Sequence, residues 1–222
     1  MTRSILSLLA SCLFVGLVAG PGCQPNGVGD PCTPDEEYVA NFAGFSEAEV
    51  NVESKSFQCR TRLCLANHFR GRVSCPYGQD ATGASPAGLK PDDPNMKSCV
   101  VPGTQTPIDP TVDQTGVPLV PVPKTGKSVP AQCVDRKAAL AVYCSCRCAA
   151  DDGTTTDGAN YCTCPDGYSC KTKNGAPLVS SIGAGDTGLT GFYCYKTGTD
   201  YDSNSACALT CDPSNPMANC DN

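Results

Sequence analysis

The chain has 222 residues, 18 cysteines, no tryptophan and a formal net charge of −6. The acidic balance argues against nucleic acid as a partner, and the 6% aromatic content predicts a thin hydrophobic core. Cysteine at this density is typical of exported proteins that disulfides stabilise.

The first 22 residues have the pattern of a secretory signal peptide. Arg3 supplies one positive charge, residues 5–18 carry no charge, and small residues follow as far as Gly22. The apolar run is too short to span a bilayer as a helix, so we expect export and removal of residues 1–22. Because Arg3 leaves with the leader, the net charge of the mature chain becomes −7.

Cys23 directly follows the leader, at the position that is acylated in bacterial lipoproteins. Gly22 fits the lipobox, whereas Gly20 and Pro21 depart from it. Ordinary cleavage would leave an odd number of cysteines in an oxidising compartment, while lipidation of Cys23 leaves 16 that pair completely. We therefore predict a lipid anchor at Cys23 and a tether over 23–31, on the outer membrane or cell surface. A secreted or periplasmic protein is the alternative.

The other cysteines form two groups. Residues 32–75 hold four and predict an N-terminal module, residues 76–98 predict a polar linker, and residues 99–222 predict a C-terminal module with a proline-rich strap over 100–131. We expect the first four to pair among themselves, without a bond between the second and third, which would face opposite sides of a strand. The predicted disulfide cysteines are Cys32, Cys59, Cys64, Cys75, Cys99, Cys133, Cys144, Cys146, Cys148, Cys162, Cys164, Cys170, Cys194, Cys207, Cys211 and Cys220.

Alternating apolar residues predict short strands in four places, 57–65, 142–148, 161–164 and 191–195. Residues 134–142 fit a short helix or a strand about equally well. The proline-rich stretch 116–124 predicts an extended, polyproline-like segment. The expected fold is small, disulfide-rich and mainly β, with short strands, hairpins and long irregular loops.

Two resemblances accompany these patterns. Residues 162–170, Cys-Thr-Cys-Pro-Asp-Gly-Tyr-Ser-Cys, resemble the C-terminal half of an EGF-like module. The chain as a whole resembles the uncharacterised cysteine-rich lipoproteins of myxobacteria, in the segments 29–32, 58–64, 72–78 and 143–148. This resemblance implies a location in the cell envelope and brings no activity with it.

Catalytic and metal-binding patterns are weak in this sequence. A catalytic triad or a histidine-based metal site would need His68, the only histidine of the chain. The closely spaced Cys144, Cys146 and Cys148 have the chemistry of a zinc or copper cluster, but exported thiols oxidise, so we expect disulfides there. We predict no cofactor and no metal.

Residues 200–211 begin like a calcium-binding loop. Asp200, Asp202 and Asn204 alternate as the first ligands of such a loop do. The sixth position is Ser205 rather than glycine, and the twelfth is Cys211 rather than glutamate. A solvated turn is therefore the preferred interpretation.

A basic stretch in an acidic chain is the strongest indication of a partner. Residues 59–75 contain four arginines and one histidine and no acid. Arginines on one strand face suit the carboxylate, phosphate or sulfate groups of a polyanion such as an envelope polysaccharide. Alternatively, they pair with acids from elsewhere in the fold. The predicted binding residues are Arg60, Arg62, Arg70 and Arg72.

The sequence thus favours a non-enzymatic, surface-anchored lipoprotein of the bacterial envelope with a structural or binding role. Its expected partners are the membrane, through the N-terminal lipid, and an envelope polysaccharide or another surface protein. A secreted protease inhibitor and a hydrolytic enzyme without a recognisable motif are the alternatives.

Overall fold

The computed structural model describes residues 27–80, 83, 99–109, 128–180 and 189–220. The predicted signal peptide, Cys23 and the polyproline-like segment 116–124 lie outside the described residues. The described part is small, disulfide-rich and mainly β, with long irregular loops, which confirms the predicted fold class.

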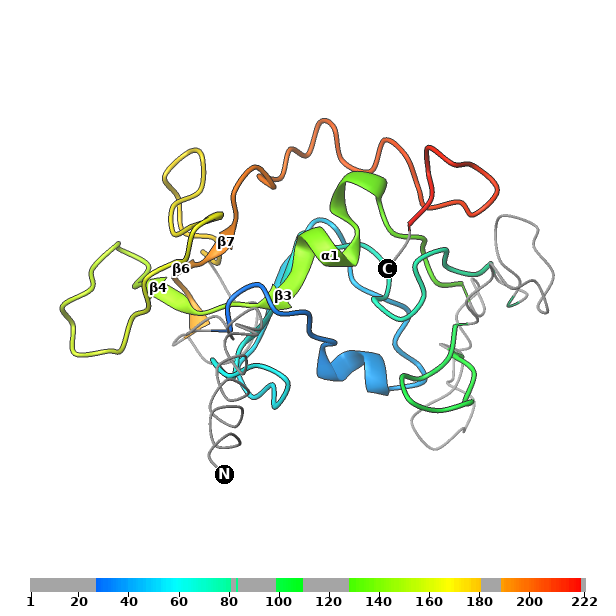
Figure 1. The fold of residues 1–222 in the computed structure, drawn as a ribbon, viewed down its shortest axis with the longest axis horizontal. Coiled ribbons are helices and arrows are strands. Elements are labelled where there is room, and N and C mark those ends of the chain that lie inside the picture. Colours follow the sequence, from blue (N-terminus) through cyan, green and yellow to red (C-terminus); the bar gives the residue numbers. More distant parts are fainter. Residues whose placement is uncertain (1–26, 81–82, 84–98, 110–127, 181–188, 221–222) are drawn as a thin grey trace, which may run out of the picture.

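Short elements alternate with long loops along the described chain (Figure 1). In chain order they are η1 (Asp35–Tyr38), β1 (Val50–Glu53), β2 (Cys64–Asn67), η2 (Val134–Arg136), α1 (Ala138–Ala141), β3 (Val142–Cys144), β4 (Arg147–Ala149), β5 (Tyr168–Ser169), β6 (Phe192–Tyr193) and β7 (Tyr195–Lys196).

β2 is the central strand of a three-stranded antiparallel sheet in the order β1-β2-β3. All four of its residues are buried. Successive side chains of a strand point to opposite faces, and here each face meets a different part of the core. Leu65 packs with Tyr143 and Tyr193 on one side, whereas Cys64 and Ala66 belong to a second cluster. β2 therefore joins two small cores that neither flanking strand could hold together alone.

Two smaller antiparallel ladders extend the molecule beyond this sheet. β4 pairs with β6, and β5 pairs with β7. Gly191, just before β6, has φ of +134°, and a Cβ atom there would lie 2.7 Å from the carbonyl oxygen of Ala149. Only glycine permits this close approach of the two strands.

All sixteen predicted cysteines form disulfides, which confirms that part of the sequence analysis. The eight bonds are Cys32–Cys64, Cys59–Cys144, Cys75–Cys99, Cys133–Cys207, Cys146–Cys162, Cys148–Cys170, Cys164–Cys194 and Cys211–Cys220.

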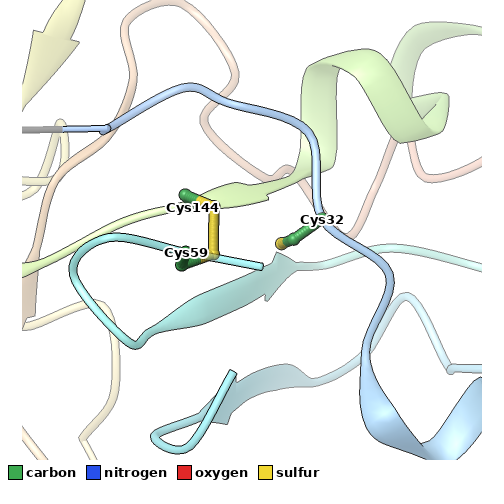
Figure 2. A group of neighbouring side chains, drawn as sticks. All are labelled: Cys32, Cys59 and Cys144. Atoms are coloured by element: carbon green, nitrogen blue, oxygen red, sulfur yellow. A yellow bond between two sulfur atoms is a disulfide. The ribbon is translucent and has the colours of Figure 1, made fainter. Parts of the chain in front are cut away.

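Of the bonds expected within the first four cysteines, Cys32–Cys64 is formed, whereas the expected pairing of Cys75 with one of the middle two is wrong. Cys59 and Cys64 do avoid each other, but Cys59 bonds to Cys144 beside Cys32, as Figure 2 shows, and Cys75 bonds to Cys99. The physical reason is that β2 is buried and needs a partner at each edge, and β3 supplies the second one. The predicted modules 32–75 and 99–222 therefore share one sheet and are not separate.

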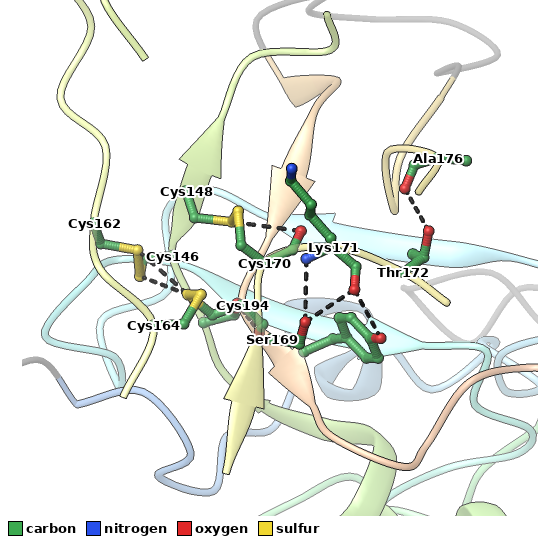
Figure 3. The surroundings of a disulfide bond; sticks show 12 residues. Cys146, Cys148, Cys162, Cys164, Ser169, Cys170, Lys171, Thr172, Ala176 and Cys194 are labelled. Carbon is green, nitrogen blue, oxygen red and sulfur yellow. Dashed lines mark hydrogen bonds between the residues drawn. A yellow bond between two sulfur atoms is a disulfide. The ribbon is translucent and has the colours of Figure 1, made fainter. Parts of the chain in front are cut away.

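Three disulfides gather where the two small ladders meet (Figure 3). The sulfur of Cys194, between β6 and β7, lies 3.7 Å from that of Cys146 and 3.6 Å from that of Cys162. The three cysteines of the EGF-like stretch 162–170 each bond outside that stretch. This sulfur cluster ties both ladders to the segment that precedes β4.

Several predicted elements take a different form. Residues 57–63 are a loop rather than a strand, because the backbone turns at Arg62, which has φ of +64°. The predicted strand 142–148 divides into β3 and β4, and 161–164 is irregular. The predicted strand 191–195 corresponds to β6 and the first residue of β7, and 134–142 corresponds to η2 and α1.

Candidate functional site

Arg72 lies in the protein interior, so its assignment as a surface binding residue is wrong. The side chains of Arg72 and Glu37 are both 0% exposed, and Nε of the arginine lies 3.9 Å from Oε2 of the glutamate. Arg72 also donates hydrogen bonds to the carbonyl oxygens of Phe42, at 2.6 Å, and of Glu37. The Glu37 carboxylate accepts the backbone N–H groups of Val73 and Ser74. This arginine thus pairs with an acid from elsewhere in the fold, as the alternative interpretation expected.

The other three arginines of the predicted patch lie in different surroundings. Arg70 donates to the sulfur of Cys207 at 3.0 Å and packs against a disulfide. Arg60 and Arg62 are exposed on the loop 54–63, where the Arg62 guanidinium lies 4.3 Å from the centre of the Phe57 ring. The four arginines therefore do not form the common binding face that the sequence suggested.

The sulfur groups with metal-like spacing are oxidised. Sulfur atoms of Cys32, Cys59 and Cys144 lie within 4.8 Å of one another, but each belongs to a disulfide. The cysteines of the triple 144–148 are bonded in the same way. A disulfide sulfur carries no thiolate charge for a metal ion.

The carboxylates of the calcium-like stretch serve different hydrogen bonds. Asp202 accepts the backbone N–H of Asn204 at 2.9 Å and the hydroxyl of Ser205 at 2.9 Å, and these bonds lower its pKa. Asp200 Oδ1 instead accepts the backbone N–H of Lys173 at 3.0 Å and the hydroxyl of Tyr195 at 3.1 Å. Asp202 thus closes its own turn, whereas Asp200 links two distant segments.

Two neighbouring hollows on the described surface share His68 and Leu178 as lining residues. The first, of about 510 Å³, lies between the end of β2, the loop 172–178 and residues 199–201 after β7. The second, of about 480 Å³, runs along residues 48–52 and the segment 178–180. We call the two hollows together the His68 groove. Its lining residues come from β1 at one end and from β7 and the segment after it at the other.

His68 stands at the junction of the two hollows. Its ring stacks on Tyr201 with centres 4.0 Å apart and planes 7° from parallel. Nδ1 lies 3.0 Å from the carbonyl oxygen of Glu47, and because a carbonyl oxygen only accepts, Nδ1 carries the proton. Burial lowers the pKa of His68, so the ring is neutral at neutral pH.

Arg136, from η2, holds the walls of the groove together. It donates to the carbonyl oxygens of Asn67 at 2.6 Å, His68 at 2.7 Å and Thr199 at 3.0 Å. Its guanidinium lies 5.7 Å from the centre of the Tyr201 ring. A single buried side chain therefore connects the end of β2 with the segment after β7.

The loop 172–178 forms the opposite wall and is ordered by its own polar side chains. The hydroxyl of Thr172 donates to the carbonyl oxygen of Ala176 at 2.6 Å (Figure 3) and lies 2.7 Å from Oδ1 of Asn174. Oδ1 of Asn174 also accepts the backbone N–H of Ala176 at 3.2 Å. Both walls are thus fixed before any ligand arrives.

Comparison of the chain with protein-family models, with curated proteins and with solved structures gives no match. Among the described residues, none of the helices has the length and apolar character needed to cross a membrane.

The sequence pointed to parts of this groove without joining them. The sequence marks His68 and Asp200 only as isolated candidates for other chemistry, and Arg136 and Tyr201 match no functional motif. An arginine and a tyrosine next to irregular segments look like ordinary surface residues. Their roles appear only when the fold brings residues 67–68 beside residues 199–201.

Proposed function

We propose that this protein is a non-enzymatic, lipid-anchored binding protein of the cell envelope. The observation that carries the proposal is the His68 groove. Its walls are held in place by disulfides, by Arg136 and by the ordered loop 172–178. Preformed clefts with a few convergent polar groups are the usual form of ligand sites. A rigid cleft also loses little conformational entropy when it binds.

The disulfides indicate an exported protein, since eight such bonds form and persist in oxidising compartments. The more specific anchor at Cys23 is part of the proposal. Its support is the leader, the fit of Gly22 and the complete pairing of the other sixteen cysteines of the mature chain.

The surroundings of His68 support binding rather than catalysis. A catalytic histidine base presents one ring nitrogen to a nucleophile, while an acid, an amide or a carbonyl orients the other. Nδ1 of His68 meets a backbone carbonyl, and one face of the ring lies flat on Tyr201. Among the described residues, its ring has no hydrogen bond to a serine, threonine or cysteine side chain, so no nucleophile is paired with it.

The anchor is tested by expressing the full chain in a Gram-negative host, with Cys23→Ala beside it. Wild-type protein should partition into detergent with the intact mass of a cleaved, acylated chain. Cys23→Ala should appear as a soluble form or as uncleaved precursor, and Cys12→Ala, within the leader, should behave as wild type. A correctly cleaved Cys23→Ala protein that stays in the membrane fraction would contradict the anchor.

Protease inhibition is a second candidate function, and the loop 151–160 is the observation that favours it. This loop is largely exposed, and the disulfides Cys146–Cys162 and Cys148–Cys170 brace its base. Tyr161, directly after the loop, donates its hydroxyl to Oδ2 of Asp157 within it at 2.7 Å. Inhibitors of proteases present a rigid exposed loop of this kind, and incubation with a panel of proteases would reveal slow cleavage there with loss of protease activity.

A further inference from the structure

We infer that the His68 groove binds an uncharged glycan chain. The inference rests on the proposed binding function and names the ligand class of that site. Three properties of the groove lead to it: a low net charge, a high density of hydroxyl and amide groups, and aromatic rings on its walls.

The charge of the groove argues against a polyanionic ligand. Among the described lining residues, the first hollow carries one cation, Lys173, and one anion, Asp200, and the second carries one anion, Glu49. His68 adds no charge at neutral pH because burial lowers its pKa. The arginines that would suit a polyanion lie elsewhere, with Arg72 in the interior. A ligand matched to this surface has no net charge of its own.

Polar groups that pair with sugar hydroxyls surround the first hollow. Thr172, Asn174 and Thr199 contribute hydroxyl and amide groups, and Asp200 contributes a carboxylate. Asn67 also lines the hollow, but its side-chain oxygen has almost no accessible surface. The groups that a sugar can reach are therefore those of the exposed residues, Asn174 and Asp200 above all.

Aromatic rings provide the apolar part of the site. Tyr201 lines the first hollow and His68 lines both, and each is partly exposed, whereas Tyr195, also in the lining of the first hollow, is buried. The C–H faces of a pyranose ring are apolar while its rim carries hydroxyl groups, so sugars lie against rings and bond to polar neighbours at once. Aromatic side chains offer this contact at a low cost in conformational entropy.

The extent of the groove indicates a chain rather than a single sugar. The two hollows, of about 510 and 480 Å³, are neighbours that share His68 and Leu178 as lining residues. A monosaccharide would fill only part of one hollow. An oligomer can lie across both, with its middle unit beside His68.

The test is calorimetric titration and array binding of the full-length, oxidised protein with named probes. The uncharged probes are cello-, xylo-, chito- and maltohexaose, and the charged probes are alginate and heparin oligosaccharides. Wild type should bind at least one uncharged probe, with an affinity that changes little between low and high salt.

Tyr201→Ala should weaken that binding by about tenfold or more, and Tyr201→Phe should retain most of it. Tyr38→Ala, an exposed tyrosine outside the groove, is the matched control and should leave affinity unchanged.

Tyr201 also contacts His68, so a second variant guards against loss of the fold. Ala176 is exposed and lines the first hollow. Ala176→Phe should obstruct the groove and abolish binding without lowering the melting temperature. Binding that survives both Tyr201→Ala and Ala176→Phe would overturn the site.

Failure of the glycan inference is distinguishable from failure of the proposed function. Salt-sensitive binding of only the charged probes, or capture of an extended peptide in place of sugars, would overturn the inference while leaving a binding role intact. Wild-type protein that binds none of the uncharged probes would also overturn it. The anchor is measured separately by membrane partitioning and intact mass.

Discussion

Burial distinguishes Arg72 from the other arginines of the predicted patch. Arg72 and Glu37 are completely enclosed, and the hydrogen bonds around them reach the backbone at Phe42, Val73 and Ser74. Such a pair adds little net stability compared with apolar residues, but removing one partner leaves an uncompensated buried charge. The pair therefore makes the junction between η1 and the segment 72–75 sensitive to single substitutions.

We predict that Glu37→Ala lowers the free energy of unfolding by about 3 to 5 kcal/mol. Arg60→Met removes an exposed guanidinium from the predicted patch that also included Arg72. It should change the free energy of unfolding by about 0.5 kcal/mol or less. Denaturant unfolding with the disulfides intact measures both. A Glu37→Ala variant as stable as Arg60→Met would mean that Arg72 is not buried in solution.

The carboxyl group of Glu53, at the end of β1, should make the stability of the fold depend on pH. Burial raises the pKa of its carboxyl group to about 7, and the nearby charge of Asp35 adds to the shift. Because the folded chain holds this proton more tightly than the unfolded chain, the stabilising contribution is complete below the ordinary pKa of the group. It is lost as pH rises from about 5 through about 7.

We expect Glu53→Gln to remove this part of the pH dependence, since the amide does not titrate. Thermal unfolding of both proteins between pH 4 and 8 is the measurement, and the difference between the two curves isolates Glu53 from other groups. The stability of Glu53→Gln relative to wild type should increase as pH rises. Parallel curves across that range would show that the carboxyl group titrates normally.

At this scale the sequence indicated which cysteines are bonded but not which arginines are buried. The even count of cysteines after Cys23 was enough to predict complete pairing. Arg60 and Arg72 look alike in the sequence, because the acid that pairs with Arg72 belongs to η1, 35 residues earlier. His68 and Tyr201 are even further apart, so their stacking left no local pattern.

Short elements depend on their cross-links more than on their own hydrogen bonds. The three-stranded sheet has strands of only three or four residues, and Cys59–Cys144 and Cys32–Cys64 secure it from outside. A disulfide restricts the unfolded chain more strongly when the loop it closes is longer. The bond between Cys59 and Cys144 closes 85 residues, whereas Cys211–Cys220 closes 9.

We predict that replacing Cys59 and Cys144 together by alanine costs about 4.5 kcal/mol of stability in the chain-entropy description, whereas the Cys211 and Cys220 double variant costs about 2.5 kcal/mol. The first change also separates β3 from the loop before β2, so it should weaken glycan binding in the groove. Chemical unfolding of the two double variants compares them directly. Equal losses would indicate that the long bond is not formed in the native protein.

The elements also show why alternation of apolar residues was an incomplete guide. Residues 57–65 alternate as a strand does, yet only Cys64 and Leu65 belong to β2. Phe57 is 83% exposed, and its ring faces the Arg62 guanidinium rather than the core. A left-handed residue at Arg62 breaks the extended backbone, and no sequence pattern of arginine marks that conformation.

At the scale of the whole molecule, the cysteine count is compatible with two disulfide arrangements, and composition does not distinguish between them. Even numbers on each side of the linker permit closed modules, but they equally permit bonds that cross it. The burial of β2 on both faces favours the second arrangement, because an isolated module would leave one edge of that strand unpaired. The groove depends on this arrangement, since Arg136 joins residues 67–68 of the predicted first module to residue 199 of the second.

The most direct test of this account is disulfide mapping of the oxidised protein after a specific protease site is placed between residues 90 and 91 and cut. The account predicts one covalent species without reduction, with no thiol open to alkylation under denaturing conditions. It also predicts cross-linked peptides that join Cys59 to Cys144 and Cys75 to Cys99. Separation into two fragments without reduction would contradict it, because the sheet and the His68 groove would then be built from two independent modules.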